Sequence, residues 1–110
     1  MKNLAVVLLC LLVPACTTHS SMRQVADFGT QMARQGLWRE AAFRWNQALT
    51  TDPTNAKLLN NLAVAAEVRG DYDRAAHLYK KAFTLDPDNR IIRKNYDKLK
   101  TFLNSQRSAD

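Results

Sequence analysis

Apolar residues in the second half of the chain recur at spacings of three and four, the period of an amphipathic helix. Across residues 56–69 this stripe consists of Leu59, Leu62, Ala63 and Ala66. Beyond Gly70 a second stripe consists of Tyr72, Ala75, Ala76, Tyr79, Ala82 and Phe83. Glycine enters the left-handed region without penalty, so Gly70 should end the first helix, and Asp71 can cap the second. The pattern predicts two consecutive helices, the second ending at Asp86-Pro87 because the residue before proline is disfavoured in a helix.

A third stripe predicts a helix over residues 90–104, with Asn89 as its cap. At about 100° per residue its inward side chains fall within a narrow arc. They are Ile92, Tyr96, Leu99 and Leu103, with Ile91 and Phe102 on the flank. Charged residues fill the other positions, as expected of a terminal helix that covers the preceding pair with one face and meets water with the other. Residues 105–110 are interpreted as a tail.

The helix pair over 56–89 repeats an earlier pattern. An offset of 34 residues aligns Gly36 with Gly70, Ala41 with Ala75, Trp45 with Tyr79, Ala48 with Ala82, and Asp52-Pro53 with Asp86-Pro87. A fixed period, at which one aromatic residue takes the place of another, indicates a repeat. Residues 22–55 and 56–89 resemble two tetratricopeptide repeats (TPRs). The resemblance implies an all-α fold, a short α-solenoid of two TPR helix-turn-helix repeats plus the capping helix at 90–104.

Small residues stand where paired helices touch in the TPR family, and here they are Gly29, Ala41, Ala48, Ala63, Ala75 and Ala82. Four aromatic residues at repeat positions are interpreted as packing between helices, and they are Trp38, Trp45, Tyr72 and Tyr79. The alternative is that one of them is partly exposed and binds a ligand by stacking. Two repeats are fewer than the usual three, and the first helix has no preceding neighbour. Val25, Phe28 and Met32 can therefore pack only inward, and we expect self-association or a partner on that edge.

The N-terminus has the form of a secretory signal peptide over residues 1–15. Its apolar run from Leu4 to Val13 spans about 15 Å as a helix, roughly half of a hydrocarbon core, and is too short to cross a membrane. Leu12 to Cys16 resembles the lipobox of bacterial lipoproteins, although Pro14 is unusual there. The resemblance implies a covalent lipid on Cys16, such as palmitate.

Residues 16–21 are then expected to be the lipidated cysteine and a polar linker. In the lipoprotein family the residue after the cysteine sorts the product, and Thr17 implies the outer membrane, facing the periplasm. The alternative is an ordinary signal peptide cleaved between Ala15 and Ser21.

The chain carries 16 Lys and Arg against 10 Asp and Glu, a net charge of +6. Nearly all of the excess lies within residues 90–107, where six basic residues face Asp97 alone. This basic end can be a solubilising surface, or it can contact anionic headgroups, an acidic partner or cell-wall polymer. Nucleic acid is not expected as a partner because export removes the chain from it.

Catalytic patterns are absent from the sequence. His19 falls in the expected linker, and His77 has no cysteine or paired carboxylate near it in the repeat. No metal-binding or nucleophile motif occurs, so we predict a non-enzymatic protein with no cofactor besides the lipid.

TPR proteins normally bind on the concave face lined by the first helix of each repeat. The candidate peptide-binding residues on this face are Arg23, Asp27, Thr30, Lys57, Asn60, Asn61, Lys94, Asn95 and Lys98. Asparagine amides can bond an extended peptide, and lysines can meet its carboxylates. Chaperone-cofactor members use a carboxylate clamp, of which only Asn61 fits, because Ala26, Thr30 and Ile91 hold other clamp positions. For Asn60 and Asn61 the alternative is ordinary solvated surface.

These features predict a membrane-anchored periplasmic TPR adaptor or scaffold that mediates protein–protein interaction in cell-envelope, pilus or secretion assembly. Its partners would be a protein or peptide and, through the lipid, the membrane. The alternative is a structural module attached by its basic C-terminal helix to anionic membrane or cell-wall polymer.

Overall fold

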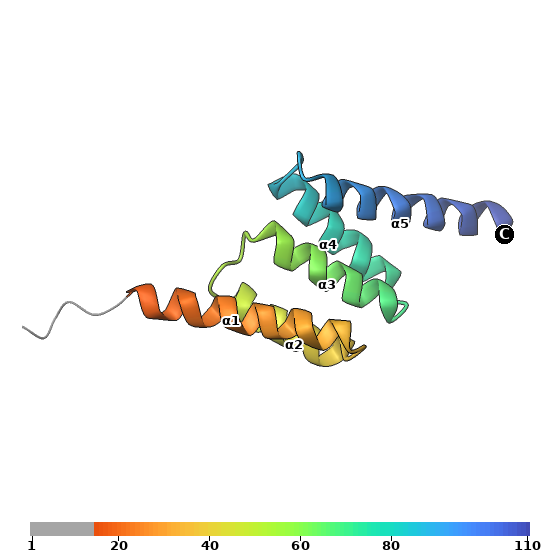
Figure 1. The fold of residues 1–110 in the computed structure, drawn as a ribbon. Coiled ribbons are helices and arrows are strands. Elements are labelled where there is room, and N and C mark those ends of the chain that lie inside the picture. Colours follow the sequence, from red (N-terminus) through yellow and green to blue (C-terminus); the bar gives the residue numbers. More distant parts are fainter. Residues whose placement is uncertain (1–14) are drawn as a thin grey trace, which may run out of the picture.

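A computed structural model describes the backbone of residues 15–110 and the side chains of residues 21–110. Within this range the chain forms five helices and no strand (Figure 1). The helices are α1 (Ala15–Arg34), α2 (Trp38–Leu49), α3 (Ala56–Val68), α4 (Tyr72–Leu85) and α5 (Arg90–Ala109). The predicted all-α fold is therefore confirmed, with α1 and α2 forming one hairpin and α3 and α4 the next.

Small residues allow the helices to approach closely, as predicted. Ala41, Ala63, Ala75 and Ala82 are fully buried. Gly29 on α1 lies against α2, where a Cβ atom would come within 2.9 Å of Trp45 Nε1. Trp45 is itself buried and donates its indole N–H to the Ala26 carbonyl of α1 at 3.2 Å. The Trp45 indole ring thus occupies the space beside Gly29, where there is no side chain, and holds α1 against α2.

Equivalent residues of the two repeats end and begin the helices. Gly36 and Gly70 have φ of +80° and +78°, the left-handed conformation that ends α1 and α3. Asn55 and Asn89 cap α3 and α5 by accepting backbone N–H groups through their side-chain oxygens. Each of these two amides also donates to the aspartate three residues earlier, at 2.9 and 3.1 Å. This local network gives the repeated Asp-Pro pattern a physical basis, because the aspartate holds the capping amide in place.

Helix α5 closes the C-terminal end of the fold. Ile92 and Leu99 are buried, and Tyr96 packs its ring 6.5 Å from Tyr79 and 6.1 Å from Phe83. The predicted stripe therefore faces the second hairpin. No helix in the described range, residues 15–110, is both long and apolar enough to cross a membrane.

Two boundaries differ from the sequence prediction. The expected linker at 16–21 is part of α1, and the expected tail at 105–110 is helical as far as Ala109. Neither segment contains glycine or proline, so nothing in either interrupts backbone hydrogen bonding. The signal peptide predicted for residues 1–15 lies, but for Ala15, outside the described residues. Cys16 lies in the first turn of α1.

Candidate functional site

Helices α1, α3 and α5 run in the same direction and contribute the side chains of the predicted binding face (Figure 1). We call this surface the first-helix face. Positions 34 residues apart are equivalent on it, so Arg23, Lys57 and Ile91 correspond, as do Asp27, Asn61 and Asn95. The structure brings some of the predicted residues to two hollows on this face and leaves the others outside both.

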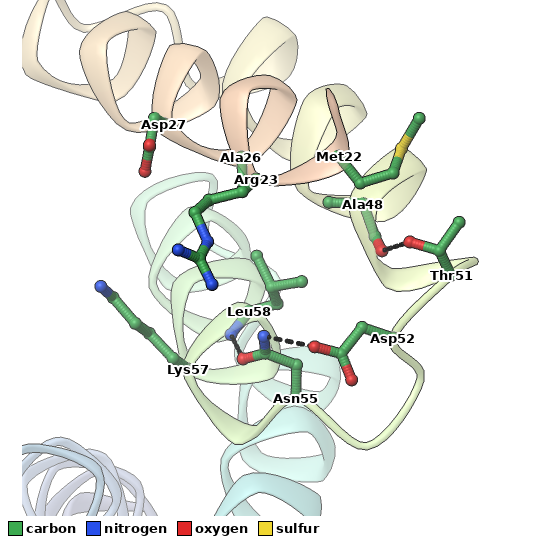
Figure 2. Close-up of a pocket in the computed structure, with 10 residues that line it drawn as sticks. All are labelled: Met22, Arg23, Ala26, Asp27, Ala48, Thr51, Asp52, Asn55, Lys57 and Leu58. Carbon is green, nitrogen blue, oxygen red and sulfur yellow. Dashed lines mark hydrogen bonds between the residues drawn. The ribbon is translucent and has the colours of Figure 1, made fainter. Parts of the chain in front are cut away.

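The first hollow lies between α1 and the start of α3 and has a volume of about 290 Å³. Three predicted residues line it, namely Arg23, Asp27 and Lys57. Figure 2 shows Arg23 extending downwards from α1 and Lys57 extending from the start of α3, with Asp27 on the α1 side. On the far wall, Asp52 is engaged by the Asn55 amide.

The two cations of this first hollow have no ion-pair partner among residues 21–110, where the one recorded ion pair joins Lys100 to Asp97. Arg23 and Lys57 are both exposed. Two positive groups that line one hollow can both donate to a carboxylate bound there, and such charge-assisted hydrogen bonds are stronger than neutral ones.

The second hollow, about 450 Å³, lies between α3, the start of α4 and α5. Its walls are largely apolar and consist of Val64, Val68, Tyr72 and Phe102, with Asn95 and Lys98 at its α5 side. Val68 is 53% exposed, and the ring centroids of Tyr72 and Phe102 are 5.0 Å apart. This hollow can accept an apolar side chain while Lys98 remains free to meet an acidic neighbour.

Sequence reasoning did not select Tyr72 or Phe102 as site residues. Tyr72 occupies an aromatic repeat position and was assigned to packing, yet it is 37% exposed and lines the second hollow. The other packing assignments hold for Trp45 and Tyr79, which are buried. Phe102 lies on the flank of the apolar stripe predicted for residues 90–104. This flank position was the one sequence signal that its ring could be partly exposed.

Some predicted residues are engaged within the fold. Asn60 is 7% exposed, and its side-chain oxygen accepts a hydrogen bond from the Asn95 amide at 3.1 Å. This corrects the prediction for Asn60, because a buried amide that joins α3 to α5 does not face a ligand. Thr30 donates its hydroxyl to the Ala26 carbonyl at 3.2 Å. Asn61 is half-buried and borders neither hollow.

Lys94 also stands apart from the two hollows. It lies in a shallow depression on α5 with Arg90, Ile91, Arg93 and Asp97. The lysine that α5 brings to the second hollow is Lys98, one turn further along the helix. The structure thus separates Lys94 from the binding surface that the sequence pattern assigned to it.

Tyr79 forms the floor of the second hollow and donates its hydroxyl to Glu67 at 2.9 Å. Burial raises the pKa of the Tyr79 phenol well above its ordinary value, and the hydrogen bond to Glu67 and the charge of Glu67 raise it further. Glu67 accepts this hydrogen bond and keeps its negative charge, so the second hollow is lined by one carboxylate, Glu67, and one ammonium group, Lys98.

The raised pKa of Tyr79 predicts a loss of stability at alkaline pH. The folded state holds the proton more tightly, so this contribution is complete below about pH 10, the pKa of a free tyrosine, and is lost as the pH rises towards the folded pKa. Tyr79→Phe should lower the free energy of unfolding by about 1 kcal/mol at neutral pH. Above about pH 10, the free energy of unfolding of this variant should fall less steeply with pH than that of the wild type. Urea unfolding at several pH values measures both effects, and parallel profiles for the two proteins would contradict the assignment.

The side chains described here contain no group of three or more His, Cys, Asp or Glu that could hold a metal ion. His77 is exposed on α4.

Comparison with known proteins identifies the fold and the family of this chain. A solved structure described as the second TPR of Spaghetti (RPAP3) bound to HSP90 peptide SRMEEVD matches with a TM-score of 0.73 and 22% identity, over 80% of this chain and 82% of that one. The chain therefore has a TPR-like fold. It belongs to the family Domain of unknown function (DUF6340), which matches residues 27–106.

A curated relative, Protein O-mannosyl-transferase TMTC1 from Mus musculus, is 31% identical over 71 residues. The match covers 64% of this chain and 8% of that protein. The likeness therefore concerns a small part of the relative.

Proposed function

We propose that this protein is a membrane-anchored periplasmic adaptor whose first-helix face binds an extended, carboxylate-bearing segment of a partner protein. Assembly of the cell envelope, a pilus or a secretion system is the setting we propose for it. The observation that carries the proposal is the convergence of Arg23 and Lys57 on one hollow, without an ion-pair partner among residues 21–110. A peptide carboxylate can accept charge-assisted hydrogen bonds from both side chains.

The second hollow supports a peptide over an isolated anion. It lies on the same face and offers apolar walls beside Lys98. An extended peptide can place an acidic residue in one hollow and an apolar side chain in the other. The peptide named in the similar structure, SRMEEVD, is rich in acidic residues and also carries methionine and valine. The ligand we propose has that mixed character.

Selection from a random peptide display library on the immobilised protein tests this function. Recovered sequences should be enriched in Asp or Glu with an apolar residue nearby, and their capture should persist at about 1 M salt, where the Debye length is only about 3 Å, because apolar contact contributes. Recovery with no sequence preference would contradict a peptide-binding face.

The proposed anchor is a lipid on Cys16. Because α1 begins at Ala15, the lipid would sit at the N-terminal end of this helix, and the fold would start directly at the membrane. Multiple acyl chains hold a protein at a bilayer much better than one chain does. We expect Cys16→Ser to move the protein from the membrane fraction to the soluble periplasmic fraction, with Cys10→Ser as the matched control that remains on membranes. A Cys16→Ser protein that still fractionates with membranes would contradict the anchor.

A second candidate function is attachment through α5 to anionic membrane or cell-wall polymer. Within residues 90–107 the basic residues are Arg90, Arg93, Lys94, Lys98, Lys100 and Arg107. Lys100 is the member that has an ion pair, with Asp97 at 2.9 Å. Attachment of this kind weakens steeply with salt, as the Debye length falls from about 10 Å at 0.1 M to about 3 Å at 1 M. Sedimentation with anionic vesicles that is lost at high salt, without peptide selection, would favour it.

A further inference from the structure

The outer side of the first hairpin carries aromatic side chains that the fold leaves uncovered. Phe28 on α1 is 45% exposed and Phe43 on α2 is 64% exposed. Beside them, a shallow hollow of about 540 Å³ is lined by Met32, Arg39, Glu40, Phe43 and Arg44. We call these residues, with Phe28, the N-terminal edge. It lies apart from both hollows of the first-helix face.

Comparison of the two repeats shows that the N-terminal edge lacks a neighbouring helix pair to cover it. Phe28 is equivalent to Leu62, which lies 34 residues later. Leu62 is 4% exposed because it packs in a cluster with Ala41, Trp45 and other residues of the preceding hairpin. Among the described residues no hairpin precedes α1, so Phe28 stays in water. A stacked helix pair would bury it as α2 buries Leu62.

The charges of the N-terminal edge are mixed. The Arg44 guanidinium lies over both aromatic rings, 5.4 Å from the Phe28 centroid and 5.7 Å from that of Phe43. This contact occupies Arg44. Glu40 and Arg39 are neighbours on α2, both are exposed, and no ion pair within residues 21–110 involves either of them.

We propose that a second copy of this chain covers the N-terminal edge in a twofold-symmetric dimer. A twofold axis places the same patch on both copies, so Glu40 of each copy can meet Arg39 of the other. The Phe28 and Phe43 rings of both copies then form one apolar centre with charged residues around it. This pattern matches the usual anatomy of an interface, with an apolar core and a polar rim.

The opposite end of the molecule favours a closed dimer over a filament. Stacking head to tail would bring Arg39 and Arg44 against the outer surface of α5. That surface carries Arg90, Arg93 and Lys94 with a single acid, Asp97. Like charges placed opposite one another would oppose such stacking. Self-pairing of the N-terminal edge instead offers Glu40 of one copy to Arg39 of the other.

Sedimentation velocity of the purified protein, together with light scattering, tests this proposal. We expect a dimer whose fraction rises with concentration, and Phe43→Glu should convert it to a monomer. Phe43 is largely exposed, so circular dichroism should show an unchanged fold. Leu85→Glu is the matched control, because Leu85 is 42% exposed on α4, away from the N-terminal edge, and this variant should remain dimeric.

A charge exchange makes the test independent of the aromatic residue. Glu40→Arg should weaken the dimer at least tenfold, and Arg39→Glu combined with Glu40→Arg should restore it. A monomeric wild type at about 100 µM, where an interface with a micromolar dissociation constant would be largely formed, would overturn the proposal. A dimer unaffected by Phe43→Glu, or lost in Leu85→Glu, would overturn it as well. Peptide binding to the first-helix face should be unchanged in Phe43→Glu, so the two proposals fail separately.

Discussion

Replacing Trp45 with alanine should lower the free energy of unfolding by about 3–5 kcal/mol, the usual cost of removing a buried large aromatic side chain. Trp45 is 3% exposed, fills the space beside Gly29 and donates to the Ala26 carbonyl. No other helix can collapse into the gap without moving α1 from α2. Because domains are stable by only about 5–15 kcal/mol, this loss is a large fraction of the total stability, and the melting temperature should fall markedly.

Urea denaturation followed by circular dichroism measures this loss. The matched variant is Trp45→Phe, which keeps a ring against Gly29 but gives up the indole hydrogen bond, and it should lose clearly less stability than Trp45→Ala. A Trp45→Ala protein within about 1 kcal/mol of the wild type would show that α1 and α2 are held together by other contacts.

Reversing the charges of Arg23 and Lys57 should abolish measurable binding of a selected acidic peptide. A hydrogen bond to a charged group contributes about 1.5–3 kcal/mol. Since each 1.4 kcal/mol is about tenfold in affinity, either single reversal should raise the dissociation constant by roughly tenfold to a hundredfold. Titration calorimetry with a peptide from the library selection measures the change.

Stability is not expected to fall with these reversals. Both side chains are exposed, and Lys57 stands in the first turn of α3, where an acidic residue is favoured by the helix dipole. Lys80→Glu with Lys81→Glu is the matched control, because it changes the net charge equally on the exposed surface of α4. Equal weakening by both pairs would indicate that only the overall charge attracts the peptide, and the first hollow would lose its assigned role.

The helix order could be predicted from the sequence because its signals are local. Gly36 and Gly70 end helices through their own φ angles, and Asn89 caps α5 within its own turn. The outer helix limits were missed because hydrophobic periodicity reports burial, and burial ends at Leu103 while the backbone continues as a helix to Ala109. The same holds at the beginning of α1, where a polar segment without a helix breaker was interpreted as a linker.

The candidate site was predictable only in part, because it depends on how the helices are rotated. Arg23, Asp27 and Lys57 were selected by the repeat, and they share the first hollow. Asn60 and Asn61 are neighbours in sequence, yet Asn60 bonds to α5 and is buried. That contact spans 35 residues, and no local pattern specifies it. The pairing of Tyr72 with Phe102 has the same long-range origin.

The most direct test of the central claim is a two-dimensional NMR titration of the isotope-labelled protein with the selected peptide. Chemical-shift changes are expected to cluster at the two hollows, around Arg23, Lys57, Val68 and Lys98, with little change on α4 near Lys80. Changes confined to the outer surface of α5, around Arg90 and Arg93, would contradict the central claim and would place the binding surface on the basic helix.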